Sequence, residues 1–270
     1  EKKEAGRIYL TIFPFVGASP AIAPLIGGEL LHHFSWHSTF VFLAIFIVVT
    51  FFCVVFFLKE TLAPDKRSRF QLSTLLQNIG IVLSNKKFIF YASVPCFAYA
   101  AYFAYIVESP FLLTQFGLNP ALIGYSYIGL SLTYILGNIT ARKVTQKLPI
   151  EQAVRMGYLI FFAGSMLFLG QSYLSTHLLV TSIFSISVLT FGNGFLLPLG
   201  TALAIASHQK AAGTASGVMG ALQLSSAALS SALIGKISHH DPHWVAILLA
   251  FLCVCGFIRY MRGFKKHATN

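Results

Sequence analysis

Glu108 is an acidic residue deep inside a long apolar stretch of the sequence, and it has tyrosines beside it. Tyr105 lies one helical turn earlier on the same face, and Tyr102 is close by. A charge in the middle of a bilayer costs about 2.5–3.5 kcal/mol on the insertion scale, so an acid retained there is a functional candidate. Glu108 is therefore predicted to bind protons or substrate; the alternative is a residue at the lip of a helix that reaches outer water. Glu29, at the outer end of an earlier apolar stretch, is a second candidate.

Neutral polar residues within the apolar stretches could line a cavity. Ser131, Tyr134 and Asn138 recur at helical spacing, Asn193 lies between two glycines, and Gln223 lies in a later stretch. The alternative is hydrogen bonding between helices, which contributes about 0.6 kcal/mol per contact in a membrane. For Asn138, Asn193 and Gln223 both interpretations stay open.

Two histidine clusters support a rival hypothesis of another class. His33-x3-His37 and His239-His240-x2-His243 resemble fragments of the histidine boxes of membrane di-iron enzymes, and imidazole clusters suit iron or zinc. A third box is missing, and Asp241 is the only acid nearby. The sequence also has no Walker loop, nucleophile elbow or Rossmann fingerprint. We therefore expect no enzyme, no resident metal and no cofactor, while adventitious metal binding or pH sensitivity at the histidines stays open.

The composition is that of a membrane protein. The 270 residues are 56% hydrophobic and 10% charged, with a mean hydropathy of +0.74, whereas soluble domains carry about 25% charged residues. The four cysteines fall in apolar runs and are not spaced as a disulfide framework or a zinc site. No soluble domain is expected.

A bilayer-spanning helix needs about 20 mostly apolar residues. Eight stretches meet this requirement: Ile8–Leu30, Trp36–Leu58, Phe88–Leu113, Ala121–Ala141, Gln152–Ser172, His177–Ala206, Ala212–Ile237 and Trp244–Met261. The predicted fold class is thus all-α and integral to the membrane.

The basic residues orient these spans. If the N-terminus is cytoplasmic, 18 of the 19 Lys and Arg residues, all except Lys236, fall in inner segments. Because cytoplasmic loops carry an excess of Lys and Arg, both termini of the chain are predicted to be cytoplasmic. The net charge of +11 is mostly this topology signal. A nucleic-acid surface is a poor alternative, since the bases are split among short loops.

One sizeable inner loop divides the chain. Within residues 59–87, Leu72, Leu75, Leu76, Ile79 and Leu83 recur at helical spacing, which predicts an amphipathic helix on the inner membrane surface. Residues 1–58 then form the last two helices of one bundle, and residues 88–270 form a complete six-helix bundle.

Small residues and prolines mark two spans in which packing or motion is expected. The first span contains Pro20, Pro24, Gly27 and Gly28, and such residues are tolerated in a membrane helix where neighbours satisfy the backbone. The seventh contains Gly213, Gly217 and Gly220, whose spacing lets helix backbones approach closely.

Taken in order, these motifs resemble the Major Facilitator Superfamily, and within it the bicyclomycin and chloramphenicol resistance (Bcr/CflA-type) branch of drug:proton antiporters. Pro24-Leu-Ile-Gly27-Gly28 resembles the end of the antiporter motif in the fifth family helix, although Leu10, Ser19 and Ala23 replace its earlier glycines. Other segments typical of the branch are Ser35–Phe40, Lys59–Leu62, Ser109-Pro110-Phe111, Pro198, Gly213–Gly217 and Gly220–Gln223.

The resemblance implies that the chain corresponds to family helices five to twelve, without the first four. It implies proton-coupled efflux of drug-like or small amphipathic molecules by alternating access in a bacterial inner membrane, by a monomer when full length. The partners would be a small-molecule substrate, protons and the lipid bilayer, with no nucleic acid. The substrate-cavity candidates are Tyr102, Tyr105, Asn138, Asn193 and Gln223, the proton-coupling candidate is Glu108, and the fragment alone is expected to be inactive. An exporter of a sugar or another metabolite is the alternative within the same fold.

Overall fold

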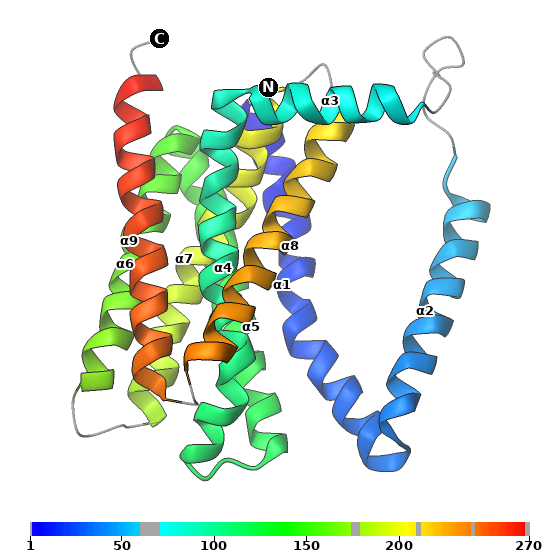
Figure 1. Cartoon of the computed structure of the whole chain (residues 1–270), viewed down its shortest axis with the longest axis vertical. Coiled ribbons are helices and arrows are strands. Elements are labelled where there is room, and N and C mark those ends of the chain that lie inside the picture. The colour runs from blue at the N-terminus through cyan, green and yellow to red at the C-terminus, as the bar shows by residue number, and fades with distance from the viewer. Residues whose placement is uncertain (1, 60–70, 174–178, 209–211, 239–240, 268–270) are drawn as a thin grey trace.

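Helices account for nearly all of the described chain. The computed structural model describes residues 2–59, 71–173, 179–208, 212–238 and 241–267, and for some helical residues, chiefly in the first helix and at the end of the last, it describes the backbone alone. Within these ranges there are nine helices (Figure 1), of which seven are long and apolar enough to cross a membrane. The chain is therefore an all-helical, multi-pass membrane protein.

The helices follow one another closely in the sequence, except for residues 58–71 between the second and the third. Their bounds are α1 Lys2–His33, α2 Trp36–Phe57, α3 Leu72–Ser84, α4 Lys86–Gln115, α5 Pro120–Lys147, α6 Ile150–Tyr173, α7 Leu179–Ala206, α8 Ala212–Ile237 and α9 Pro242–His267. The seven membrane-length helices are α2 and α4 to α9. They coincide with seven of the eight predicted spans.

The remaining predicted span, Ile8–Leu30, lies in α1, which is not among the seven membrane-length helices. In α1 the described apolar segment is shorter, Arg7–Val16. The helix nevertheless continues from Lys2 to His33, so its prolines and glycines do not break it. Figure 1 shows α1 leaning toward α2 in its second half. The side chains of Pro20, Pro24 and Gly28 lie outside the described residues, and a Cβ added at Gly27 would meet no described atom within 4 Å.

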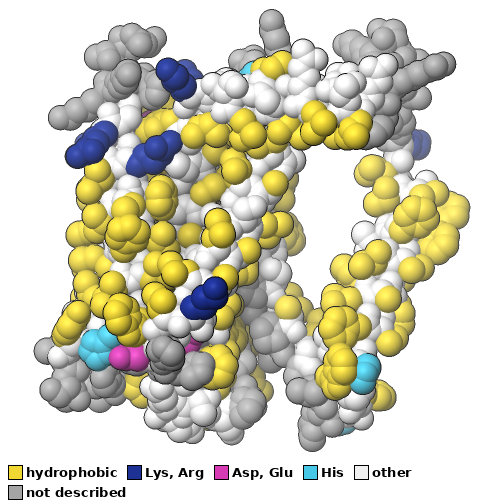
Figure 2. All heavy atoms as spheres, in the orientation of Figure 1, with side chains coloured by type: hydrophobic (Ala, Val, Ile, Leu, Met, Phe, Trp, Pro, Cys, Tyr) yellow, Lys and Arg dark blue, Asp and Glu magenta, His cyan; other side chains and the backbone are white. Residues whose placement is uncertain are grey.

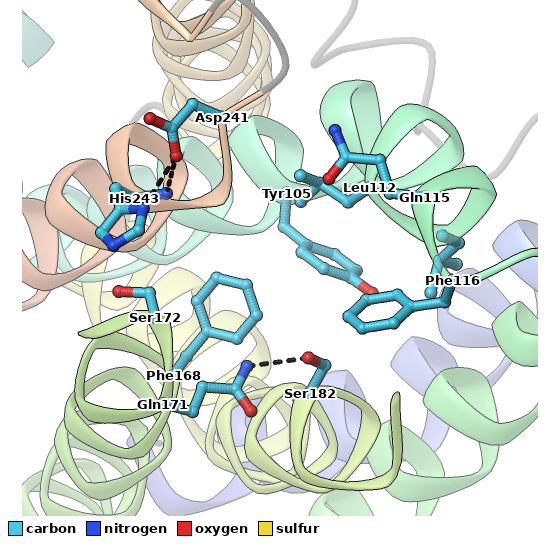
Figure 3. A pocket seen from close by; sticks show the side chains of 11 residues that line it. Tyr105, Leu112, Gln115, Phe116, Phe168, Gln171, Ser172, Ser182, Asp241 and His243 are labelled. Carbon is cyan, nitrogen blue, oxygen red and sulfur yellow. Dashed lines mark hydrogen bonds and ion pairs between the residues drawn. The ribbon is translucent and has the colours of Figure 1, made fainter. Parts of the chain in front are cut away.

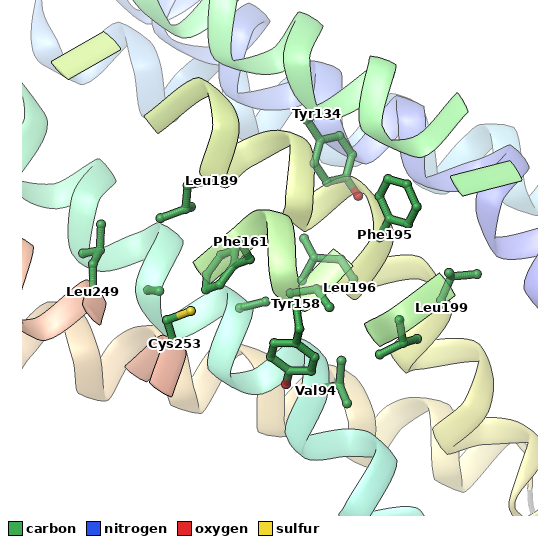
Figure 4. Packing of buried hydrophobic residues seen from close by; sticks show 14 of the residues in the cluster. Val94, Tyr134, Tyr158, Phe161, Leu189, Phe195, Leu196, Leu199, Leu249 and Cys253 are labelled. Carbon is green, nitrogen blue, oxygen red and sulfur yellow. The ribbon is translucent and has the colours of Figure 1, made fainter. Parts of the chain in front are cut away.

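The core of the bundle is built around α7, which is buried along most of its length. Gly192 and Gly194 allow this because they are about 200° apart around the helix. A Cβ at Gly192 would lie 2.8 Å from the backbone nitrogen of Phe161 in α6, and one at Gly194 would lie 2.5 Å from that of Asn138 in α5. The motif around Asn193 therefore packs α7 tightly between α5 and α6. Apolar side chains from α4, α6, α7 and α9 fill the remaining space (Figure 4).

Polar bonds cap α4 and connect it to α5. The Asn85 side-chain oxygen caps α4 by accepting from the backbone nitrogens of Lys87 and Phe88, at 3.0 and 3.1 Å. At the opposite half of α4, the Tyr127 hydroxyl of α5 lies 2.8 Å from the Ser109 hydroxyl. The cap satisfies backbone nitrogens at the start of α4. The bond to α5 holds α4 in one rotation, and this rotation determines which of its side chains face the interior.

One end of the bundle is marked by α3, which lies across the ends of the spans, and both chain termini lie at this end (Figure 1). Most Lys and Arg side chains visible in Figure 2 gather toward the α3 end, whereas most of the visible histidine side chains and the acidic ones lie toward the opposite end. Leu72, Leu76 and Leu83 of α3 are exposed. The gathering of Lys and Arg at the α3 end is the charge asymmetry that the sequence predicts between the inner and the outer side of the membrane.

The first two helices differ in how they contact the bundle. α1 packs against α5 and α7, and Leu10 joins the buried core. α2 has no buried residue and stands apart from the bundle beyond an opening (Figure 2). Of these two helices, therefore, only α1 contributes to the interior of the described structure.

The small-residue face of α8 has no close neighbour among the described residues. Added Cβ atoms at Gly213, Gly217 and Gly220 would meet nothing within 4 Å. The described part of the chain thus contains no helix that packs against these glycines, and their role in helix packing stays a prediction.

Candidate functional site

A pocket lies halfway along four helices, and we call it the central pocket. Its volume is about 90 Å³, and its lining residues are Val16 and Ser19 of α1, Tyr99, Tyr102 and Phe103 of α4, Ser131 and Tyr134 of α5, and Asn193 and Leu197 of α7. Because α4, α5 and α7 are of membrane length, the middle of these helices corresponds to the middle of the bilayer.

Aromatic rings make up the α4 wall of the central pocket. Tyr99, Tyr102 and Phe103 share one helical face because they are three and four residues apart. The rings of Tyr99 and Phe103 are stacked with centroids 5.3 Å apart, and those of Tyr102 and Phe103 meet edge to face at 5.9 Å. This wall offers both flat apolar surface and two hydroxyl groups.

The α5 and α7 wall carries buried polar atoms without protein partners. Among the described residues, no hydrogen bond reaches the hydroxyls of Ser131 and Tyr134 or either amide atom of Asn193. Asn193 is 1% exposed and Tyr134 is 5% exposed. Figure 4 shows the Tyr134 ring between α5 and α7, beside Phe195. Leaving a buried polar group unpaired costs about 1–3 kcal/mol, so this wall is suited to a polar group of a ligand or to water.

Of the five substrate-cavity candidates, Tyr102 and Asn193 line the central pocket. Ser131 and Tyr134, which the sequence also placed to line a cavity, lie in its wall. Asn138 is 1% exposed, and its backbone lies against Gly194 at the crossing of α5 and α7. The Gln223 amide nitrogen donates to the Thr201 hydroxyl at 3.1 Å, which connects α8 to α7. Gln223 thus takes the interhelical role that the sequence left open.

Tyr105 lines a different pocket, at the end of the bundle opposite α3. Successive residues of a helix are rotated by 100° and rise by 1.5 Å, so Tyr102 and Tyr105 occupy different levels of α4. The sequence did not predict four of the lining residues, which are Tyr99, Phe103, Ser19 and Val16. The helical spacing of Tyr99 relative to Tyr102, and the position of Phe103 next to it, could have indicated that these two rings face the same pocket.

Glu108 is buried, with 2% exposure, on α4 between Tyr105 and Leu112. The alternative of a lip residue in contact with water is therefore wrong. Glu108 is also not a lining residue of the central pocket, so direct competition of proton and substrate for that pocket does not fit the geometry. Glu29 is exposed, and its carboxylate lies 3.3 Å from the His33 ring nitrogen Nε2 at the surface.

The histidine clusters do not assemble into a metal site within the described residues, where no group of three His, Cys, Asp or Glu side chains could hold an ion. His33 pairs with Glu29, the His37 ring lies against Trp36, and His243 lies beside Asp241. His239 and His240, on which the second box depends, lie outside the described residues.

Comparison with known proteins agrees with a transporter. The chain is 24% identical to an uncharacterized MFS-type transporter, YdgK, of Bacillus subtilis (strain 168), over 86% of this chain and 58% of that protein. It is 26% identical to an uncharacterized transporter of Rickettsia bellii (strain RML369-C), over 98% of this chain and 69% of that protein. It is 25% identical to the multidrug transporter MdfA of Edwardsiella ictaluri (strain 93-146), over 76% of this chain and 50% of that protein. The chain therefore spans about half to two thirds of the length of these relatives.

The family profile of the Major Facilitator Superfamily matches residues 1–231. This match covers most of the chain, and the chain therefore belongs to the Major Facilitator Superfamily, a family of secondary transporters and not of enzymes.

Proposed function

We propose that the chain is part of a proton-coupled exporter of drug-like or small amphipathic molecules, of the Bcr/CflA type, in a bacterial inner membrane. The observation that carries this proposal is the central pocket, in which aromatic rings face buried hydroxyl and amide groups that have no partner among the described residues. Such a surface suits a molecule with a flat apolar body and a few polar groups. The similarity to proteins named multidrug transporter MdfA supports the same substrate class.

The proposed architecture places the pocket between two bundles. Residues 1–58 would be the last two helices of an N-terminal bundle, residues 59–87 a cytoplasmic linker, and residues 88–270 the C-terminal bundle. Two observations support this division: α1 is the only element outside the C-terminal bundle that contributes lining residues, and the glycine face of α8 has no described neighbour. The pocket of about 90 Å³ would then be one side of a larger cavity that opens and closes as the bundles rock.

The first experiment compares substrates and variants in the full-length transporter. Cells that lack their own efflux pumps are loaded with ethidium, chloramphenicol or a labelled hexose, and export is followed after energisation. We expect export of the drugs and not of the hexose. Asn193→Ala should reduce drug export at least about fivefold, since one hydrogen bond to a buried amide contributes about 1 kcal/mol and the shape of the wall changes as well.

Leu132→Ala is the matched control, because Leu132 is on α5 but exposed. It should transport as the unmodified protein does. Export of the hexose alone would instead assign the protein to metabolite export. If Asn193→Ala left drug export unchanged, the central pocket would not be the site that binds the transported drug.

Glu108 is the proposed proton-linked residue, and it would act through α4 instead of occupying the same pocket as the substrate. It is six residues from Tyr102 on one helix, or about 9 Å along the axis. We predict that Glu108→Gln abolishes drug export driven by a pH gradient while substrate affinity changes less than about threefold. Export into reconstituted vesicles and equilibrium binding measure the two quantities separately. Unchanged pH-driven export in this variant would disprove the coupling role.

A further inference from the structure

A second cavity, which we call the end pocket, lies at the end of the bundle opposite α3. It encloses about 440 Å³, which falls within the usual range of 300–1,000 Å³ for small-molecule sites. Its described lining residues come from α4, α6, α7, the turn after α4 and the start of α9. Unlike the central pocket, it is built within one bundle and needs neither α1 nor α2.

Aromatic rings form the inner part of the end pocket. Tyr105 and Phe168 meet edge to face, with centroids 6.0 Å apart and planes at 89°. Figure 3 shows these two rings and that of Phe116 around the open space. Tyr105 and Phe168 are buried. The arrangement provides ring faces and edges for an apolar or aromatic group, and ring faces also attract cations.

The polar groups at the α6 and α7 side of the end pocket leave acceptors available. The Gln171 amide nitrogen donates to the Ser182 hydroxyl at 2.9 Å, and the Gln171 carbonyl oxygen is buried with no partner among the described residues. The Ser172 hydroxyl donates its proton to the Leu169 carbonyl at 2.7 Å, so its oxygen can only accept further bonds. A ligand that satisfies these atoms must donate hydrogen bonds.

The rim of the end pocket carries negative charge. The Asp241 carboxylate accepts from the backbone nitrogen of His243 at 2.9 Å and lies 2.8 Å from its ring nitrogen Nδ1. Lys and Arg are absent from the described lining residues. The electrostatics of the mouth therefore favour a cation over an anion.

We propose that the end pocket is a second small-molecule site, which takes an amphipathic amine. Its ammonium or N–H group would meet the Gln171 carbonyl, and its apolar part would lie against Tyr105 and Phe168. The central pocket shares no described lining residue with it. This proposal does not rest on drug efflux, because it concerns binding within a single bundle.

The test measures binding of 1-naphthylmethylamine to the full-length protein in lipid nanodiscs, with 1-ethylnaphthalene as the isostere that lacks the amine and reports partition into lipid. Gln171→Leu removes the acceptor and keeps the size, and Ser182→Phe fills the cavity. Leu167→Ala is the control, because Leu167 lies on α6 but is exposed. Asn193→Ala distinguishes the end pocket from the central pocket. Thermal unfolding of each variant verifies that it is folded.

We expect saturable binding of the amine in the unmodified protein, Leu167→Ala and Asn193→Ala. Affinity should fall about tenfold or more in Gln171→Leu, the loss expected for one hydrogen bond to a charged group, and Ser182→Phe should not bind. No saturable binding beyond that of 1-ethylnaphthalene would overturn the proposal. Binding that is lost in Asn193→Ala and unchanged in Gln171→Leu and Ser182→Phe would overturn it too, by assigning the amine to the central pocket.

Discussion

Two tyrosines of α5 carry hydroxyl groups in opposite situations. The Tyr127 hydroxyl lies 2.8 Å from the Ser109 hydroxyl, and because Ser109 donates its own proton to the Ile106 carbonyl, Tyr127 is the donor between them. The Tyr134 hydroxyl is buried without a partner among the described residues. The first group stabilises the bundle, whereas the second costs stability, which the proposed binding in the central pocket would explain.

The same substitution should therefore have opposite effects at the two positions. Tyr127→Phe removes a buried hydrogen bond and should lower the free energy of unfolding by about 0.5–1.5 kcal/mol. Tyr134→Phe removes an unpaired buried hydroxyl and should leave the free energy of unfolding unchanged or raise it, while drug export falls. Thermal unfolding in detergent and export by the full-length protein provide the two readouts. Equal destabilisation by both changes would mean that Tyr134 has a structural partner.

The sequence identified the polar residues of the central pocket more successfully than it identified the partners and cavities that these side chains face. Tyr102 and Asn193 could be selected because polar side chains are rare in membrane spans. Gln223 could not be separated from them, since the same rarity fits an interhelical bond, and only the rotation of α8 shows that its amide reaches Thr201. The end pocket was missed because its walls come from the ends of several helices far apart in the sequence.

At the scale of elements, α7 depends on glycines at its crossings with neighbouring helices. Gly137 of α5 packs directly against the backbone of Phe191 in α7, close to the site residue Asn193. Gly129, two turns earlier on the same helix, has no described atom within 4 Å of an added Cβ. The crossing of α5 and α7 thus sets the shape of one wall of the central pocket.

Gly137→Ala and Gly129→Ala form a matched pair for this crossing. A methyl group at Gly137 forces the backbones apart and should destabilise the protein by about 1–3 kcal/mol, with loss of drug export. The same change at Gly129 should be neutral or stabilising by up to about 1 kcal/mol, because Ala favours helix over Gly. Chemical or thermal unfolding of the two variants gives the comparison. A Gly137→Ala variant as stable as Gly129→Ala would show that α5 and α7 do not approach this closely.

The spans themselves were predictable, since helix existence in a bilayer follows from apolar length. The contacts of each span were less predictable, because they depend on how the helix is rotated. Gly213, Gly217 and Gly220 were predicted to pack, yet the described chain leaves them open, while the decisive close contacts occur at Gly137, Gly192 and Gly194. Small-residue spacing indicates where a helix can be approached closely but does not identify the helix that approaches it.

At the scale of the whole molecule, one end of the bundle is basic and the other carries histidine and acidic groups (Figure 2). The α3 helix and both chain termini lie at the basic end (Figure 1). The positive-inside rule predicts that this end faces the cytoplasm. The end pocket would then open toward the outer side of the membrane.

Two exposed positions test this orientation. Leu148, in the turn between α5 and α6, lies toward the α3 end, and Tyr173, at the last residue of α6, lies toward the other end. In a cysteine-free version of the full-length protein, a membrane-impermeant maleimide should label Tyr173→Cys in intact cells. It should label Leu148→Cys only after permeabilisation, because the bilayer blocks the reagent. The reverse labelling pattern would mean that the protein has the opposite orientation in the membrane. The end pocket would then open to the cytoplasm, and its amine would be captured from inside the cell.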